Sequence, residues 1–116
     1  MHLRPQPAAP SGEPHTDGLS PFCPRFQYAI ELIGRRWVGA VLRVLGSRPA
    51  RFNEILAAVP NLSDRLLTER LRELEQAGVL ERRVVPASPP YAEYRLTERG
   101  RALAPVVQAL GAWRAS

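Results

Sequence analysis

The sequence predicts an α+β fold that is mainly α, in which five helices accompany one β-hairpin. Apolar residues recur at spacings of three and four over five segments, which is the period of a helix with one buried face. Residues 79–85 and 91–96 are instead rich in β-branched, aromatic and alternating side chains, which favours strands. Hydrophobic residues make up 45% of the 116 residues and charged residues 23%, so the chain can bury a core as a single domain.

The first twenty residues have the composition of a disordered tail. Prolines stand there among alanine, serine and glycine, and too few large apolar groups are present to offset the entropy of ordering. The two histidines, His2 and His15, do not form a pattern of metal ligands. We therefore expect a disordered Pro-rich tail over residues 1–20, a folded domain over residues 21–116, and no metal or other cofactor.

Three helices are expected in the first half of the folded domain, over residues 21–34, 37–46 and 52–59. The first two end at glycines, which are frequent helix stop signals. The third ends before Pro60, whose ring disfavours helical backbone at the residue before it. Each segment carries one apolar stripe, so all three are expected to pack on a shared core.

A fourth helix follows after only three residues. Ser63 is a good N-cap, and an apolar stripe that includes Leu67, Leu71 and Leu74 comes after it. A connection as short as residues 60–62 sets two helices at a steep angle, as in a helix-turn-helix. The second helix of such a pair can enter a DNA major groove, which is about 12 Å wide.

The hairpin and one last helix complete the domain. The two expected strands flank a turn at residues 86–90 that three prolines stiffen. Thr97 then caps a final helix whose apolar stripe ends at Trp113. A hairpin placed behind a helix-turn-helix is a wing. The predicted fold class is therefore a winged helix-turn-helix with a two-stranded wing and additional N- and C-terminal helices.

The charge of the chain favours a polyanionic partner. The net charge is +5 and the pI about 10.6, and all sixteen basic residues are arginines, although a GC-rich genome produces the same bias. Charge alone leaves nucleic acid and an anionic membrane surface as alternatives. No apolar run approaches the about eighteen residues of a membrane span, and no signal peptide is evident. We expect a cytoplasmic protein without a membrane partner.

The candidate contacts to double-stranded DNA lie on the fourth helix, on the hairpin and just before the third helix. Amides at the start of the fourth helix can bind a phosphate while Arg65 reaches a base edge. Arginines on the hairpin can straddle a phosphate strand or enter a minor groove. The candidates are Arg51, Ser63, Asp64, Arg65, Thr68, Glu69, Arg72, Arg82, Arg83 and Arg95.

Alternatives remain open for part of this set. Arg72 can equally be a solvated surface residue, which is the interpretation preferred for Glu73 and Gln76. The three hairpin arginines can instead form ion pairs across the strands with Glu81 and Glu93.

Two other classes of function are less consistent with the sequence. Catalysis is not expected, because no serine, cysteine or histidine has a general base or a phosphate-binding glycine loop beside it. A protein-interaction module without base readout is the alternative function, and it would present an apolar reading face. The fourth helix instead presents polar and charged residues.

Five short segments between residues 23 and 113 carry a family resemblance. They are Cys23-Pro24, ELIGRRW over 31–37, RFNEI over 51–55, LTERLRELEQAGVL over 67–80 and PPYAEYRLTERGRAL over 89–103. In this order they resemble the HxlR-type regulators, which are winged-helix relatives of the MarR group. Where the family pattern has Gly-Lys before the tryptophan, this chain has Arg35-Arg36, which preserves a basic charge.

The resemblance implies a sequence-specific transcriptional regulator, expected to be a repressor, that binds an inverted-repeat operator as a homodimer. The N- and C-terminal helices of both chains would form the dimer. The apolar stripes of these helices are consistent with a dimer, because their apolar area is larger than one small domain readily buries. The expected interface residues are Phe26, Ile30, Ile33, Leu103, Val107, Leu110 and Trp113.

Two hypotheses concern the signal. Cys23, the single cysteine, lies where some similar regulators sense oxidants or electrophiles, and the alternative is a small apolar plug beside the first helix. The second hypothesis is a small apolar effector between the first and last helices, near Phe26, Trp37 and Trp113. Its alternative is that these aromatic residues form plain core.

Overall fold

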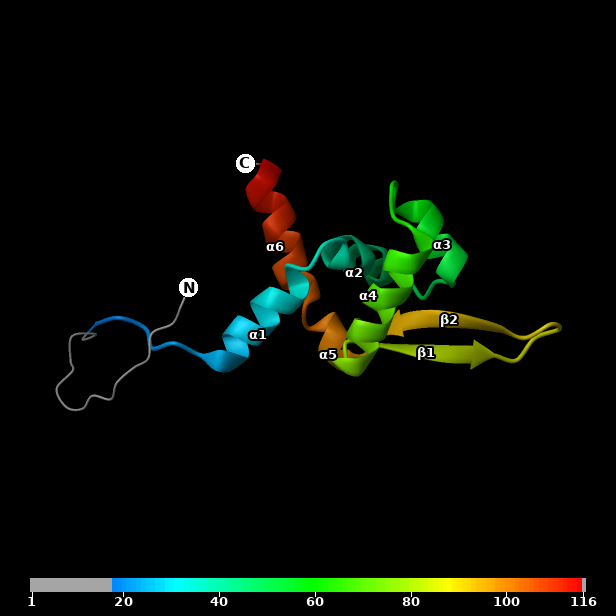
Figure 1. The fold of residues 1–116 in the computed structure, drawn as a ribbon, viewed down its shortest axis with the longest axis horizontal. Helices are drawn as coiled ribbons and strands as arrows, with labels where there is room; N and C mark the ends of the chain where they lie inside the picture. The colour runs from blue at the N-terminus through cyan, green and yellow to red at the C-terminus, as the bar shows by residue number, and fades with distance from the viewer. Residues whose placement is uncertain (1–17, 116) are drawn as a thin grey trace.

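The computed structural model describes residues 18–115, which fold into six helices and one two-stranded antiparallel sheet (Figure 1). The predicted tail, residues 1–20, lies almost entirely outside the described residues. The elements are α1 (Pro24–Ile33), α2 (Val38–Ser47), α3 (Phe52–Ala58), α4 (Asp64–Gln76), β1 (Leu80–Val85), β2 (Tyr91–Leu96), α5 (Glu98–Arg101) and α6 (Ala104–Ala115). The predicted fold class, a mainly helical winged helix-turn-helix, is confirmed.

The first four helices and both strands form where the apolar periodicity predicts them. The predicted N-cap of α4 is also confirmed, because the Oγ of Ser63 accepts a hydrogen bond from the backbone N–H of Leu66 at 3.1 Å. A small difference occurs in α2, which passes through Gly46 and ends at Ser47. A glycine inside a helix weakens it by only about 1 kcal/mol, so packing can carry the helix past it.

The last helix differs more. The single helix predicted after Thr97 is two helices, because the chain turns between α5 and α6. Pro105 explains the break, since it has no N–H to donate to the carbonyl of Arg101 and its ring would clash with that carbonyl. A proline is tolerated in the first turn of a new helix, and α6 begins one residue before it.

The helix α4 lies in the centre of the core. Its Leu67, Leu71 and Leu74 are almost completely buried, as the apolar stripe predicts. These residues belong to one continuous apolar cluster with residues of α2, α3 and the hairpin. The core therefore holds α4 by one face and leaves the opposite face to solvent.

The wing extends from this core on the side opposite the terminal helices. Strands β1 and β2 pair in register along their whole length. Ala50 adds a short bridge beside β2, where its backbone N–H donates to the carbonyl of Tyr94 at 3.0 Å and its carbonyl accepts from the Tyr94 N–H at 2.7 Å. In Figure 1 the tip of the wing points away from α1 and α6. The wing and the terminal helices can thus contact different partners.

Candidate nucleic-acid interface

Three consecutive residues between α3 and α4 shape the helix-turn-helix. Asn61 adopts left-handed backbone with φ 69°, which asparagine tolerates better than most residues. Leu62 is buried and ties the turn to the core. Ser63 then caps α4. Because Ser63, Asp64 and Arg65 are all exposed, α4 begins at the surface.

The solvent face of α4 carries the predicted reading residues. Asp64, Arg65, Thr68 and Arg72 are exposed, and Glu69 is partly buried. The side chain of Arg65 is 90% exposed, and its Nε lies 3.7 Å from a carboxylate oxygen of Glu69. An exposed ion pair of this length contributes little free energy, so Arg65 is available to a ligand. Within residues 18–115, Arg72 forms no ion pair.

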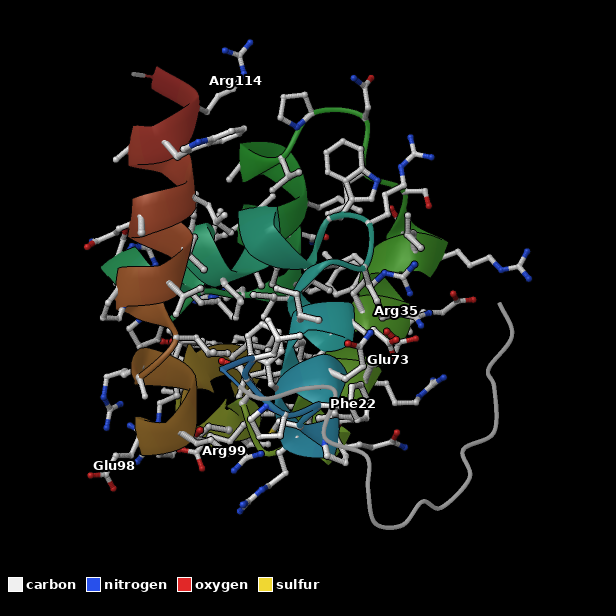
Figure 2. All side chains as sticks on the ribbon, turned by 90° about the vertical axis from the view of Figure 1, so that its left-hand side faces the viewer. Phe22, Arg35, Glu73, Glu98, Arg99 and Arg114 are labelled. Atoms are coloured by element: carbon white, nitrogen blue, oxygen red, sulfur yellow. The ribbon has the colours of Figure 1, made fainter. Side chains whose placement is uncertain are left out.

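A charged network that the sequence does not single out lies on another side of α4. Arg70 is only 9% exposed, and its guanidinium donates to the backbone carbonyl of Arg36 at 2.9 Å and to the Glu73 carboxylate at 3.2 Å. Arg35 approaches the same carboxylate at 3.0 Å, and Figure 2 shows Arg35 and Glu73 close together. The prediction that Glu73 is simply solvated is therefore wrong. The network ties α4 to the loop between α1 and α2.

The three arginines of the wing behave differently from one another. Arg95 donates to the carboxylate of Glu81 at 2.6 Å, directly across the two strands, so the alternative of a cross-strand ion pair holds for Arg95. Arg82 and Arg83 are exposed, and neither forms an ion pair in the described part of the chain, although Arg83 is directly opposite Glu93. Arg82 and Arg83 are the wing residues available to phosphate.

Arg51 connects the start of α3 with the wing. Its guanidinium carbon lies 3.5 Å from the centre of the Tyr91 ring, a cation–π contact that orients the side chain. Its backbone N–H donates to the Glu54 carboxylate at 2.8 Å. This hydrogen bond, with a second from Arg48, holds the pKa of the Glu54 carboxyl below its usual value, because both favour the charged form. Arg51 is thus positioned between the helix-turn-helix and the wing.

The terminal helices expose an apolar face. The large hydrophobic residues exposed in or beside α1 and α6 are Leu19, Phe22, Phe26, Tyr28, Ile30, Val106, Leu110 and Trp113. Three of the predicted interface residues lie elsewhere. Val107 is buried in the core of its own chain, because α6 packs against α2, and Ile33 and Leu103 are partly buried against the same core. We call the exposed large hydrophobic residues of these two helices the terminal apolar face; they are Phe26, Tyr28, Ile30, Val106, Leu110 and Trp113.

Cys23 is exposed immediately before α1. It occupies the N-cap position, and its Sγ accepts a hydrogen bond from the backbone N–H of Phe26 at 3.4 Å. The alternative of a buried apolar plug is therefore wrong. Reagents in solvent can reach this thiol.

An apolar cavity lies between α1 and the region where α5 meets α6, but the predicted aromatic cluster does not line it. The volume is about 330 Å³, and the lining residues are Pro24, Arg25, Tyr28, Ala29, Leu32, Ile33, Val79, Arg99 and Leu103. Phe26 and Trp113 are 64% and 75% exposed, and Trp37 packs partly against the core. None of the three aromatic residues lines this cavity, and the interpretation as plain core holds in part for Trp37.

A capped recognition helix, a short turn and a basic hairpin define a winged helix-turn-helix protein. Residues 32–116 match the family described as HxlR-like helix-turn-helix, and the chain belongs to that family. The family consists of transcriptional regulators, which are not enzymes. Within the described residues, no helix has the length and apolar character needed to cross a membrane.

Two relatives come from Bacillus subtilis strain 168. YvaP, an uncharacterised HTH-type transcriptional regulator, is 47% identical over 94 residues, which cover 81% of this chain and 87% of YvaP. The HTH-type transcriptional regulator YodB is 45% identical over 91 residues, which cover 78% of this chain and 81% of YodB.

Solved structures of YodB are similar to this fold. Its reduced form has a TM-score of 0.75 at 44% identity and covers 79% of this chain and 90% of YodB. The quinone-bound form has a TM-score of 0.71 at 41% identity and covers 81% of this chain and 98% of YodB. A diamide-treated form has a TM-score of 0.72 at 44% identity and covers 79% of this chain and 91% of YodB.

Proposed function

We propose that this chain is a transcriptional regulator that reads double-stranded DNA with α4 and works as a homodimer. The observation that carries the proposal is the exposed face of α4, where Arg65, Thr68 and Arg72 project from a helix whose other face is fixed in the core. A helix held in this way suits a major groove about 12 Å wide. Arg82 and Arg83 on the wing supply phosphate contacts, which position the protein on the duplex.

The homodimer rests on the terminal apolar face. An exposed apolar surface of this kind is typical of a protein interface. A second copy of the chain carries the same face, so two copies related by a two-fold axis bury their terminal apolar faces against each other. Two-fold symmetry presents two copies of α4 to one duplex, and the operator is then an inverted repeat whose half-sites are about 34 Å apart. Bound at a promoter, this dimer acts as a repressor.

Selection of duplexes from a randomised pool tests the proposed function. We expect enrichment of one inverted repeat that the native protein binds about a thousandfold or more tightly than a scrambled duplex. Equal and weak binding to all duplexes would contradict the proposal. That outcome would favour the alternative of a protein-interaction module without base readout.

The proposed signal is an oxidant or an electrophile that reacts with Cys23. The thiol is exposed at the start of α1, next to the terminal apolar face. Its modification, or a disulfide to the partner subunit, therefore alters how the two subunits pack against each other. In the disulfide case two thiols give two electrons and two protons to the oxidant. The diamide-treated and quinone-bound structures of YodB support this class of signal.

Diamide is expected to weaken binding of the native protein to the selected operator. Cys23→Ser should keep its affinity under the same treatment, because it lacks the only thiol of the chain. Fluorescence anisotropy before and after treatment, with a parallel count of free thiols, measures the effect. If the native protein loses its thiol but keeps its affinity, Cys23 is not the sensor.

A further inference from the structure

We call the solvent-exposed face of α4 that carries Arg65, Thr68 and Arg72 its reading face. Thr68 places a methyl group in the middle of this face. Its hydroxyl donates a hydrogen bond to the backbone carbonyl of Asp64 at 2.8 Å, so its single donor is used inside the helix. Because this bond fixes the χ1 rotamer, the methyl group also takes one defined position. Thr68 is exposed, so it can offer that methyl group to a ligand.

Two arginines flank this methyl group. Arg65 and Arg72 are three residues before and four residues after Thr68, and this spacing places all three side chains on one face of the helix. Arg65 is 90% exposed, and its 3.7 Å ion pair with Glu69 is easily exchanged for another partner. The reading face therefore combines one apolar group with guanidinium groups beside it.

The major groove contains a matching pair of groups. Guanine presents two acceptors, N7 and O6, that one guanidinium can bind together. Thymine presents a C5-methyl group, which a threonine methyl group contacts. Three residues advance about 4.5 Å along a helix, compared with about 3.4 Å per base pair, so two side chains at this spacing meet bases one or two pairs apart.

On these grounds, and resting on the proposed function, we infer that each operator half-site contains a guanine read by Arg65 and, one or two base pairs away, a thymine whose methyl group contacts Thr68. Thr68 is then a specificity-determining residue that reads a base through its methyl group. Arg72, one turn further along α4, contacts the adjacent phosphate strand.

Replacement of thymine by deoxyuridine tests the inference, because it removes only the methyl group. The selected operator is prepared with deoxyuridine at one thymine position at a time, in both half-sites. At the position beside the guanine, the native protein should bind about fourfold more weakly per half-site, or about fifteenfold for the two together. Fluorescence anisotropy of the full chain measures each affinity.

Two variants separate the methyl group of Thr68 from its hydroxyl. Thr68→Ser keeps the hydroxyl and loses the methyl group, so it should bind the thymine and uracil duplexes equally. Thr68→Val keeps a methyl group and loses the hydroxyl, so it should retain the native discrimination. Circular dichroism confirms that both variants fold.

The outcomes distinguish failure of the Thr68 inference from failure of the proposed function. If the native protein prefers the operator to a scrambled duplex but tolerates uracil at every position, the inference is overturned and the proposed function stands. Full discrimination against uracil by Thr68→Ser also overturns the inference. A native protein with no preference for the operator overturns both.

Discussion

Leu110→Asp is expected to yield a folded monomer that binds the selected operator at least about a hundredfold more weakly than the native protein. Leu110 is 56% exposed on α6, within the terminal apolar face, so its replacement leaves the core of the chain intact. In a dimer, however, the new carboxylate would be removed from water, which costs more free energy than the apolar contact of Leu110 supplies. Without the dimer, the two reading helices are no longer linked on one operator.

Sedimentation velocity measures the mass and anisotropy measures the affinity. Gln108→Glu is the matched control, because it adds a negative charge to the same helix. Gln108 lies beside the groove between α2 and α6, and helical spacing directs it away from Leu110. This control should stay dimeric with native affinity. A dimeric Leu110→Asp that binds the operator normally would show that the terminal apolar face is not the interface.

Gly100→Ala is expected to lower the free energy of unfolding by about 3 kcal/mol. A Cβ on Gly100 would clash with the backbone carbonyl oxygen of Val79, so the backbone would have to move. The same oxygen accepts hydrogen bonds from the N–H of Thr97 at 3.0 Å and from its hydroxyl at 3.1 Å. Any shift that relieves the clash therefore strains the junction between the wing and α5.

Thermal unfolding at one fixed protein concentration measures this effect, and the midpoint should fall by roughly 12 °C or more. Gly46→Ala is the control, because Gly46 is also helical but a Cβ there meets open space. Its higher helix propensity should stabilise the protein by up to about 1 kcal/mol. Equal midpoints for Gly100→Ala and the native protein would mean that α5 is not packed as described.

Much of the fold could be predicted because its signals are local. The spacing of Leu67, Leu71 and Leu74 predicts both the helix and its buried face, and Ser63 predicts where the helix begins. The break at Pro105 was also a local signal, and a proline eight residues after Thr97 excludes one regular helix between them. Apolar periodicity alone does not register this break, because the apolar residues continue on both sides of Pro105.

The site was predictable only in part, because partners distant in sequence decide which charges are free. Arg65 and Arg83 are exposed, whereas Arg95 is held by Glu81 across the wing. The buried role of Arg70 depends on the carbonyl of Arg36, thirty-four residues earlier. A signal for it existed, since Arg70 lies at helical spacing among the buried leucines, where a charged residue needs a partner.

The burial of Val107 depends in the same way on how α6 crosses α2. Periodicity places Val107 and Leu110 on one stripe, but it does not divide the stripe between the core and the exposed surface. In the structure Val107 contacts the core while Leu110 remains exposed. The width of an apolar stripe can therefore be read from sequence, but its division between two partners cannot.

The central claim is that α4 reads base sequence while the wing binds phosphate. Fluorescence anisotropy with the operator and a scrambled duplex, across a range of salt concentrations, tests it most directly in Arg65→Ala and Arg83→Ala. We expect Arg65→Ala to lose about 1 to 3 kcal/mol of discrimination between the two duplexes. Arg83→Ala should weaken binding to both duplexes alike and reduce the salt slope by about one. Equal losses on both duplexes for both variants would contradict this division of roles.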